Sequence, residues 1–135
     1  MIVLITGDRN WDDWEAVEAF AKTLNPLQDI VVQGEARGAD TMVFEVACRR
    51  HSVATLCVPP HWNYYGLGAG GKRNARMAEI IGKPDACVYF HNDLGASKGT
   101  ALMVKIAKHQ GIPVYSWREW VDTTPAWSYN GAVPQ

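Results

Sequence analysis

IVLIT, residues 2–6, is a continuous run of apolar and β-branched residues that Gly7 ends. This pattern is typical of a strand buried on both faces of a parallel sheet, because helices cover both sides of such a sheet. Similar short segments follow at residues 30–33, 55–58, 86–90 and 113–116. Helix-forming stretches alternate with them, so the sequence predicts one α/β domain, a doubly wound parallel sheet of about five strands flanked by helices.

The helices are expected at residues 12–24, 39–50, 72–81 and 99–109. The first should begin with a capping box formed by Asp12, Asp13, Trp14 and Glu15. Gly111 should close the last one. In such a sheet ligands bind at the carboxyl edge where strand order reverses, which we expect between the first and fourth strands.

Residues 61–71 hold four glycines and the aromatic residues Trp62, Tyr64 and Tyr65. A stretch of this composition predicts a long loop, and long loops in compact domains are usually functional or mobile. Its aromatic rings would either hold a base by stacking or pack among themselves at the loop tip. The sequence leaves both interpretations open.

The chain has 135 residues, of which 47% are hydrophobic and 20% charged, which suits a single domain with its own core. We expect residues 1–116 to form that domain and the aromatic residues 117–135 to pack on it or on a partner subunit. The formal net charge is −1, so the molecule has no general bias toward nucleic acid or anionic membranes. Any preference for anions must be local.

Three cysteines, Cys48, Cys57 and Cys87, lie in apolar stretches without a CxxC pair. This pattern favours packing roles in a reducing compartment over disulfides or zinc, and a cytoplasmic location is expected. The apolar opening is too short for a signal peptide, and no later segment could span a bilayer, so no membrane partner is expected.

Four segments combine glycine with a cationic side chain where a strand should hand over to a helix: GDR at 7–9, GEARGAD at 34–40, GKRN at 71–74 and SKGT at 97–100. Glycine lets backbone N–H groups approach an anion, the helix N-terminus adds positive dipole, and Arg or Lys supplies countercharge. The candidate ligand-binding residues are Gly7, Arg9, Gly34, Arg37, Gly38, Asp40, Lys72, Arg73, Asn74, Lys98, Gly99 and Thr100. Ordinary turns with solvated cations are the alternative, and the last segment lacks the full spacing of a P-loop.

These residues, in this order, resemble the SLOG superfamily of Rossmann-like proteins, which includes the LOG phosphoribohydrolases and the DNA-processing protein DprA. The resemblance is closest to the small YspA/YpsA-related branch, the DUF2493 type. It extends from Ile2 to about Val114 and is carried by residues 7–11, 34–40, 72–77, Asp85 and 99–100. It implies a nucleotide or nucleotide-derived ligand over the carboxyl edge of the sheet, and a role in sensing or processing such ligands.

LOG enzymes carry the motif PGGxGTxxE, whose glutamate assists glycosidic cleavage. Met103 stands at that position in this chain, and Ala96-Ser97 replaces the double glycine. A thioether cannot act as a base or stabilise an oxocarbenium ion, so the LOG reaction is not expected. The match to DprA is confined to the turn at residues 34–40, and no separate DNA-binding module is expected in these 135 residues.

Three hypotheses follow for the function. The first is a sensor or accessory protein that binds a nucleotide-like small molecule. The second is a hydrolase of an N-glycosidic or phosphate bond, with Asp8, Glu35, Asp40 or Asp93 as acid or base. Such an enzyme could also use a divalent metal ion as a cofactor. The third is single-stranded nucleic-acid binding, which the near-neutral charge disfavours. The family and the aromatic tail favour a homodimer.

Overall fold

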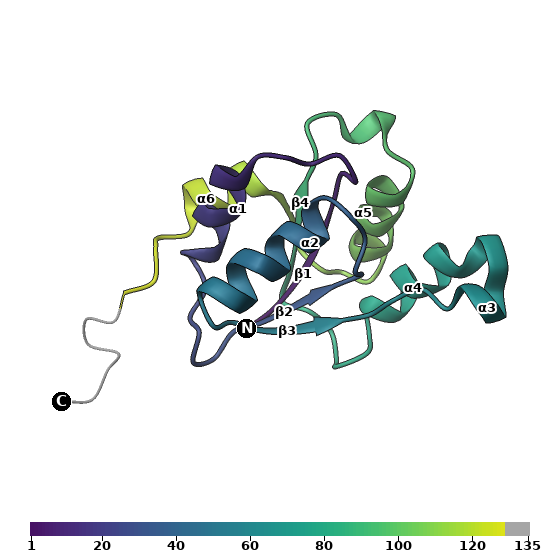
Figure 1. Cartoon of the computed structure of the whole chain (residues 1–135), viewed down its shortest axis with the longest axis horizontal. Helices are drawn as coiled ribbons and strands as arrows, with labels where there is room; N and C mark the ends of the chain where they lie inside the picture. Colours follow the sequence, from purple (N-terminus) through teal and green to yellow (C-terminus); the bar gives the residue numbers. More distant parts are fainter. Residues whose placement is uncertain (129–135) are drawn as a thin grey trace.

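Five parallel strands form the centre of the molecule: β1 (Ile2–Gly7), β2 (Ile30–Gln33), β3 (Ala54–Cys57), β4 (Ala86–Phe90) and β5 (Val114–Ser116). The computed structural model describes residues 1–128. The strand order is β3-β2-β1-β4-β5, and all pairings are parallel (Figure 1). This confirms the predicted α/β class. It also confirms that strand order reverses between the first and fourth strands, since β1 pairs with β2 on one side and β4 on the other.

Helices cover both faces of the sheet. They are α1 (Trp14–Ala21), α2 (Ala39–Val43) continued by a π-helix at Phe44–Arg50, α3 (Trp62–Tyr65), α4 (Ala69–Met77), α5 (Gly99–His109) and α6 (Trp117–Thr123), with short 3-10 turns at Gly66–Gly68 and Leu94–Ala96. One core cluster joins α1, α2 and α6 to the sheet, and a second joins α4 and α5 to its other face.

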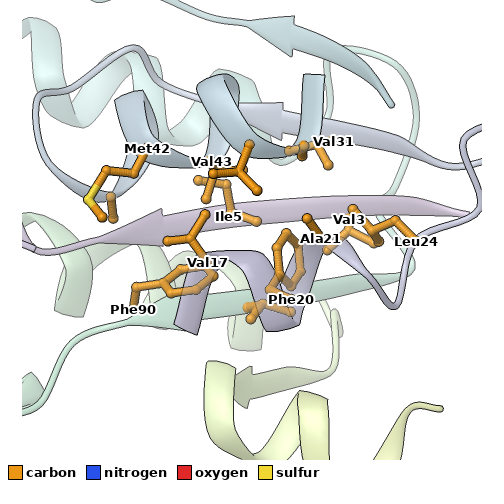
Figure 2. Close-up of a cluster of buried hydrophobic side chains, with 14 of the residues drawn as sticks. Val3, Ile5, Val17, Phe20, Ala21, Leu24, Val31, Met42, Val43 and Phe90 are labelled. Atoms are coloured by element: carbon orange, nitrogen blue, oxygen red, sulfur yellow. The ribbon is translucent and has the colours of Figure 1, made fainter. Parts of the chain in front are cut away.

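The opening strand is buried on both sides, as its apolar run predicts. Val3 and Ile5 belong to the first cluster and Leu4, between them, to the second, and all three are fully buried. Figure 2 shows Val17 and Phe20 of α1 packed beside β1 in the first cluster. Alternating side chains therefore hold the two helical layers to one strand.

The predicted capping box at the start of α1 is wrong. The N-cap is Asp13, which is extended at φ −84° and ψ 91° and accepts a hydrogen bond from the Ala16 N–H at 3.1 Å. With the cap at Asp13, Glu15 lies one position too early to complete the box. A capping box does form at α6, where Ser116 and Glu119 bond to each other's backbone N–H.

The predicted long loop at residues 61–71 is also wrong, because α3, a 3-10 turn and the start of α4 occupy it. Helix α4 begins at Ala69, so GKRN starts at its third residue and does not open it. Ala69 and Met77 of this helix are buried, and burial of such a face offsets the low helix propensity of Gly70 and Gly71.

Helix α6 was not expected from the sequence and joins the first core cluster through Trp120. The Trp120 indole N–H donates to the Thr23 hydroxyl at 2.9 Å, and both side chains are buried. The Trp127 N–H donates to the Lys22 carbonyl at 2.8 Å. The rest of the predicted aromatic tail, from Tyr129 onward, lies outside the described residues.

Thr23→Val is expected to lower the free energy of unfolding by about 1.5 kcal/mol, because it leaves the buried Trp120 N–H without an acceptor. Urea unfolding monitored by circular dichroism measures the loss. Thr23→Ser keeps the hydroxyl and is the control. A loss in Thr23→Ser with none in Thr23→Val would show that the methyl group, and not the hydrogen bond, matters.

Across residues 1–128, no helix has the length and apolar character needed to cross a bilayer.

Candidate functional site

A pocket of about 440 Å³ opens at the carboxyl edge of the sheet, beside the β1/β4 switch point. We call it the first pocket. The loops after β1, β2 and β4 form its walls together with α4 and the N-terminus of α5. Its lining residues are Thr6, Gly7, Asp8, Arg9, Asn10, Ala36, Arg37, Asp40, Arg73, Asn74, Met77, His91, Ala96, Ser97, Lys98, Gly99 and Thr100.

A second pocket of about 590 Å³ adjoins it. Its lining residues are Arg9, Gly34, Glu35, Ala36, Arg37, Pro59, Pro60, Trp62 and Arg73. Arg9, Arg37 and Arg73 line both pockets and so stand where the two meet. The two pockets together form one continuous candidate site.

The structure brings most of the predicted ligand-binding residues to this site. Gly7, Arg9, Arg37, Asp40, Arg73, Asn74, Lys98, Gly99 and Thr100 line the first pocket, and Gly34 lines the second. Of the acid/base candidates, Asp8 and Asp40 line the first pocket and Glu35 lines the second, whereas Asp93 lines neither. Gly38 and Lys72, predicted to bind the ligand, also line neither pocket.

Lys72 is excluded by the position of α4. Because residues 72–74 lie within the helix, successive side chains point about 100° apart and cannot all face one pocket. The Lys72 ammonium lies 5.9 Å from the centre of the Tyr65 ring, while Arg73 faces the site.

Arg73 is held by the turn after β2. Its Nη1 donates to the Gly34 carbonyl, and its Nε donates to Asn74 Oδ1 at 2.8 Å. A Cβ atom on Gly34 would lie 2.7 Å from the Arg73 Cζ, so any larger residue there would displace the guanidinium from this position. Partial burial lowers the pKa of Arg73 from its ordinary value, against the effect of the Asp40 carboxylate. The guanidinium nevertheless stays charged.

Asp40 lines the first pocket and is only 6% exposed. Its Oδ2 accepts hydrogen bonds from the N–H groups of Gly34 and Ala36, both at 3.1 Å, and so fixes the turn at residues 34–40. Within the described part of the chain, Oδ1 has no hydrogen-bond partner. Burial raises the pKa of Asp40 from 3.8 to about 6, although the Ala36 N–H, Arg73 and the Gly34 N–H oppose the rise.

Two glycines let the N-terminus of α2 approach the end of β1. A Cβ on Gly7 would lie 2.5 Å from the Cβ of Ala39, the first residue of α2, and 2.8 Å from the Phe90 carbonyl oxygen. Gly38 has φ +79°, and a Cβ there would overlap the Asp8 and Arg9 backbone. The Ala39 N–H then reaches the Asp8 carbonyl at 3.1 Å. Gly38 thus affects the site indirectly, because it lies against the backbone of Arg9.

The N-terminus of α5 forms the opposite wall of the first pocket with Lys98, Gly99 and Thr100. Ser97 Oγ accepts a hydrogen bond from the Thr100 N–H at 3.0 Å. Unpaired N–H groups and the dipole at a helix N-terminus both favour an anion. Met103, which aligns with the LOG glutamate in the predicted resemblance, is fully buried in the second core cluster and does not line the pocket.

His91 was missed in the sequence analysis. Its Nδ1 accepts a hydrogen bond from the Asp93 N–H at 2.9 Å, which leaves Nε2 facing Asp8 Oδ2 at 3.9 Å. His91 directly follows β4, as Asp8 follows the end of β1, and that shared position at the carboxyl edge was the available signal. Asp85 lies at the other edge, where its carboxylate accepts from the Ile2 N–H at 2.7 Å.

Within residues 1–128, the arrangement of acidic, histidine and cysteine side chains does not indicate a site for a divalent metal. No group of three or more His, Cys, Asp or Glu side chains suited to a metal ion occurs among the residues that the structure describes.

The chain matches no family model and no curated protein. The crystal structure of DNA processing protein A (DprA) from Streptococcus pneumoniae matches it with a TM-score of 0.65 and 15% sequence identity. The chain shares the Rossmann-like fold of DprA. The match covers 84% of this chain and 49% of DprA, so the chain spans about half the length of that protein. The predicted resemblance is confirmed for the fold, and assignment to the DUF2493 branch stays a prediction.

Proposed function

We propose that this protein binds a nucleotide or a nucleotide-derived phosphate compound at the carboxyl edge of its sheet and acts as a sensor or accessory protein. One observation carries the proposal: Arg9, Arg37, Arg73 and Lys98 come from four separate segments and line one pocket beside the N-terminus of α5. In the described part of the chain, none of the four forms an ion pair with a carboxylate. Four cations without an ion-pair partner in one pocket, against the Asp8 and Asp40 carboxylates there, favour an anionic ligand.

The available interactions suffice for useful affinity. A hydrogen bond to a charged group contributes about 1.5–3 kcal/mol, and micromolar binding needs about 8 kcal/mol. Three or four such contacts, with the dipole of α5, reach that range. The pocket volume of about 440 Å³ also lies in the range usual for small-molecule sites.

Arg73→Ala is expected to weaken binding of nucleoside diphosphates about 30-fold, because Arg73 lines both pockets and is already oriented by Gly34 and Asn74. Calorimetric titration with ADP, GDP, CDP, UDP and inorganic pyrophosphate measures the effect. Arg76→Ala removes the same charge from an exposed position of α4 outside both pockets and is the control. No binding by the unchanged protein, or equal losses in the two variants, would overturn the proposal.

The same samples distinguish binding from hydrolysis. Asp8 and His91 offer a carboxylate and an imidazole in the first pocket, as a variant hydrolase would need. Release of phosphate or free base during incubation would show that the protein hydrolyses the ligand. Recovery of intact ligand would show that it only binds it.

Nucleic-acid binding is the second candidate, and the fold shared with a DNA-processing protein favours it. Three arginines where two pockets meet would also suit consecutive phosphates of a single strand. Titration with oligothymidylates of increasing length decides between the two ligands. Affinity that grows with length and falls steeply with salt favours a strand, whereas tighter binding of a nucleoside diphosphate favours the small molecule.

A further inference from the structure

We propose that the second pocket receives the nucleoside of the ligand, with Trp62 as the surface on which the base stacks, while the phosphates occupy the first pocket. This inference rests on the proposed function and assigns an orientation to the ligand. The two pockets meet at Arg9, Arg37 and Arg73, so a ligand that contacts these arginines with its phosphates extends into one pocket or both.

The side chains that line the two pockets determine which end of the ligand each pocket binds. Beyond the shared arginines, the first pocket offers Lys98 and the N-terminus of α5, which favour phosphate. The second pocket offers Pro59, Pro60 and Trp62, which favour a flat apolar group. A nucleotide carries phosphate groups at one end and a flat base at the other. Its base therefore belongs beside Trp62.

Among the aromatic residues of its segment, Trp62 lines the second pocket, whereas Tyr64 and Tyr65 line neither pocket. The Tyr64 ring packs against His61 and Tyr65, with ring centres 6.0 and 4.7 Å apart, and Tyr65 also meets Lys72. Trp62 has no aromatic or cation–π partner within residues 1–128, and it is 52% exposed. It lies on α3, which extends away from the sheet (Figure 1).

Glu35 adds polar selectivity to the second pocket. Its backbone has φ +60°, and its N–H donates to the buried Gln33 side chain, which holds the turn in place. Within the described residues, its carboxylate forms no ion pair. A carboxylate there repels phosphate and accepts hydrogen bonds from an amino group of a base or from a ribose hydroxyl. Glu35 thus reinforces the orientation set by Trp62.

Trp62→Ala tests this orientation. It is expected to weaken binding of the tightest nucleoside diphosphate among ADP, GDP, CDP and UDP about 10-fold, since a stacked base is lost, and to leave inorganic pyrophosphate binding unchanged. Trp62→Phe keeps an aromatic face and should restore most of the affinity. Trp14→Ala is the matched control, because Trp14 is 46% exposed on α1 and lines neither pocket.

The outcomes separate the orientation from the proposed function. If Trp62→Ala leaves nucleoside diphosphate affinity unchanged, or weakens pyrophosphate equally, the orientation is wrong. Should Arg73→Ala still weaken both probes in that case, phosphate binding stands without it. If the unchanged protein binds neither probe, the proposed function itself fails.

Discussion

Gly38→Ala is expected to lower the free energy of unfolding by about 4 kcal/mol. Two costs add up: a side chain at φ +79° is strained, and its Cβ would overlap the backbone of Asp8 and Arg9. Because these contacts are backbone atoms, no side-chain rotation relieves them. The melting temperature should fall by about 14 °C, as measured by differential scanning calorimetry.

Gly70→Ala is the control for this substitution. Gly70 lies in α4 without a positive φ, and a Cβ there would meet no atom within 4 Å. Alanine at that position should be neutral or stabilise the protein by about 0.5 kcal/mol. A Gly38→Ala protein within 1 kcal/mol of the unchanged protein would show that the turn tolerates a side chain and that our account of it is wrong.

Asp40 is expected to make stability depend on pH. Its pKa is about 6 in the folded protein against 3.8 ordinarily, so the folded state binds this proton more tightly than the unfolded chain. Its contribution to stability is therefore fully present below about pH 4 and is lost as pH rises through 6. The loss amounts to about 3 kcal/mol, because each tenfold change in proton affinity is worth about 1.4 kcal/mol.

Asp40→Asn removes this titration and keeps an oxygen for the N–H groups of Gly34 and Ala36. We expect the stability of the variant, relative to the unchanged protein, to rise by up to about 3 kcal/mol between pH 4 and pH 7. Urea unfolding of both proteins at matched pH values measures the difference and cancels the titration of every other group. A difference that stays constant across this range would contradict the raised pKa.

The amino-acid sequence alone determined the strands and most of the layering. Strands β2 and β4 and helix α5 lie at the predicted residues, because runs of apolar residues and their spacing report burial directly. The position of the pocket also followed from the sequence. The ends of parallel strands meet at one edge, so glycine and cations placed just after β1 and β2 and just before α5 must come together there.

Tertiary structure alone decided which side chains of those segments face the pocket. Arg73 lines it and Lys72 does not, because α4 begins at Ala69 and its buried face, which includes Met77, sets the rotation of the helix. His91 joins the site from a segment without a binding motif, and the structure selects Trp62 from the three aromatic residues for which stacking on a base was one prediction. Local patterns report whether a residue is buried and in which element it lies. They do not report the rotation of a helix or the partners of a ring, which depend on contacts between segments distant in the chain.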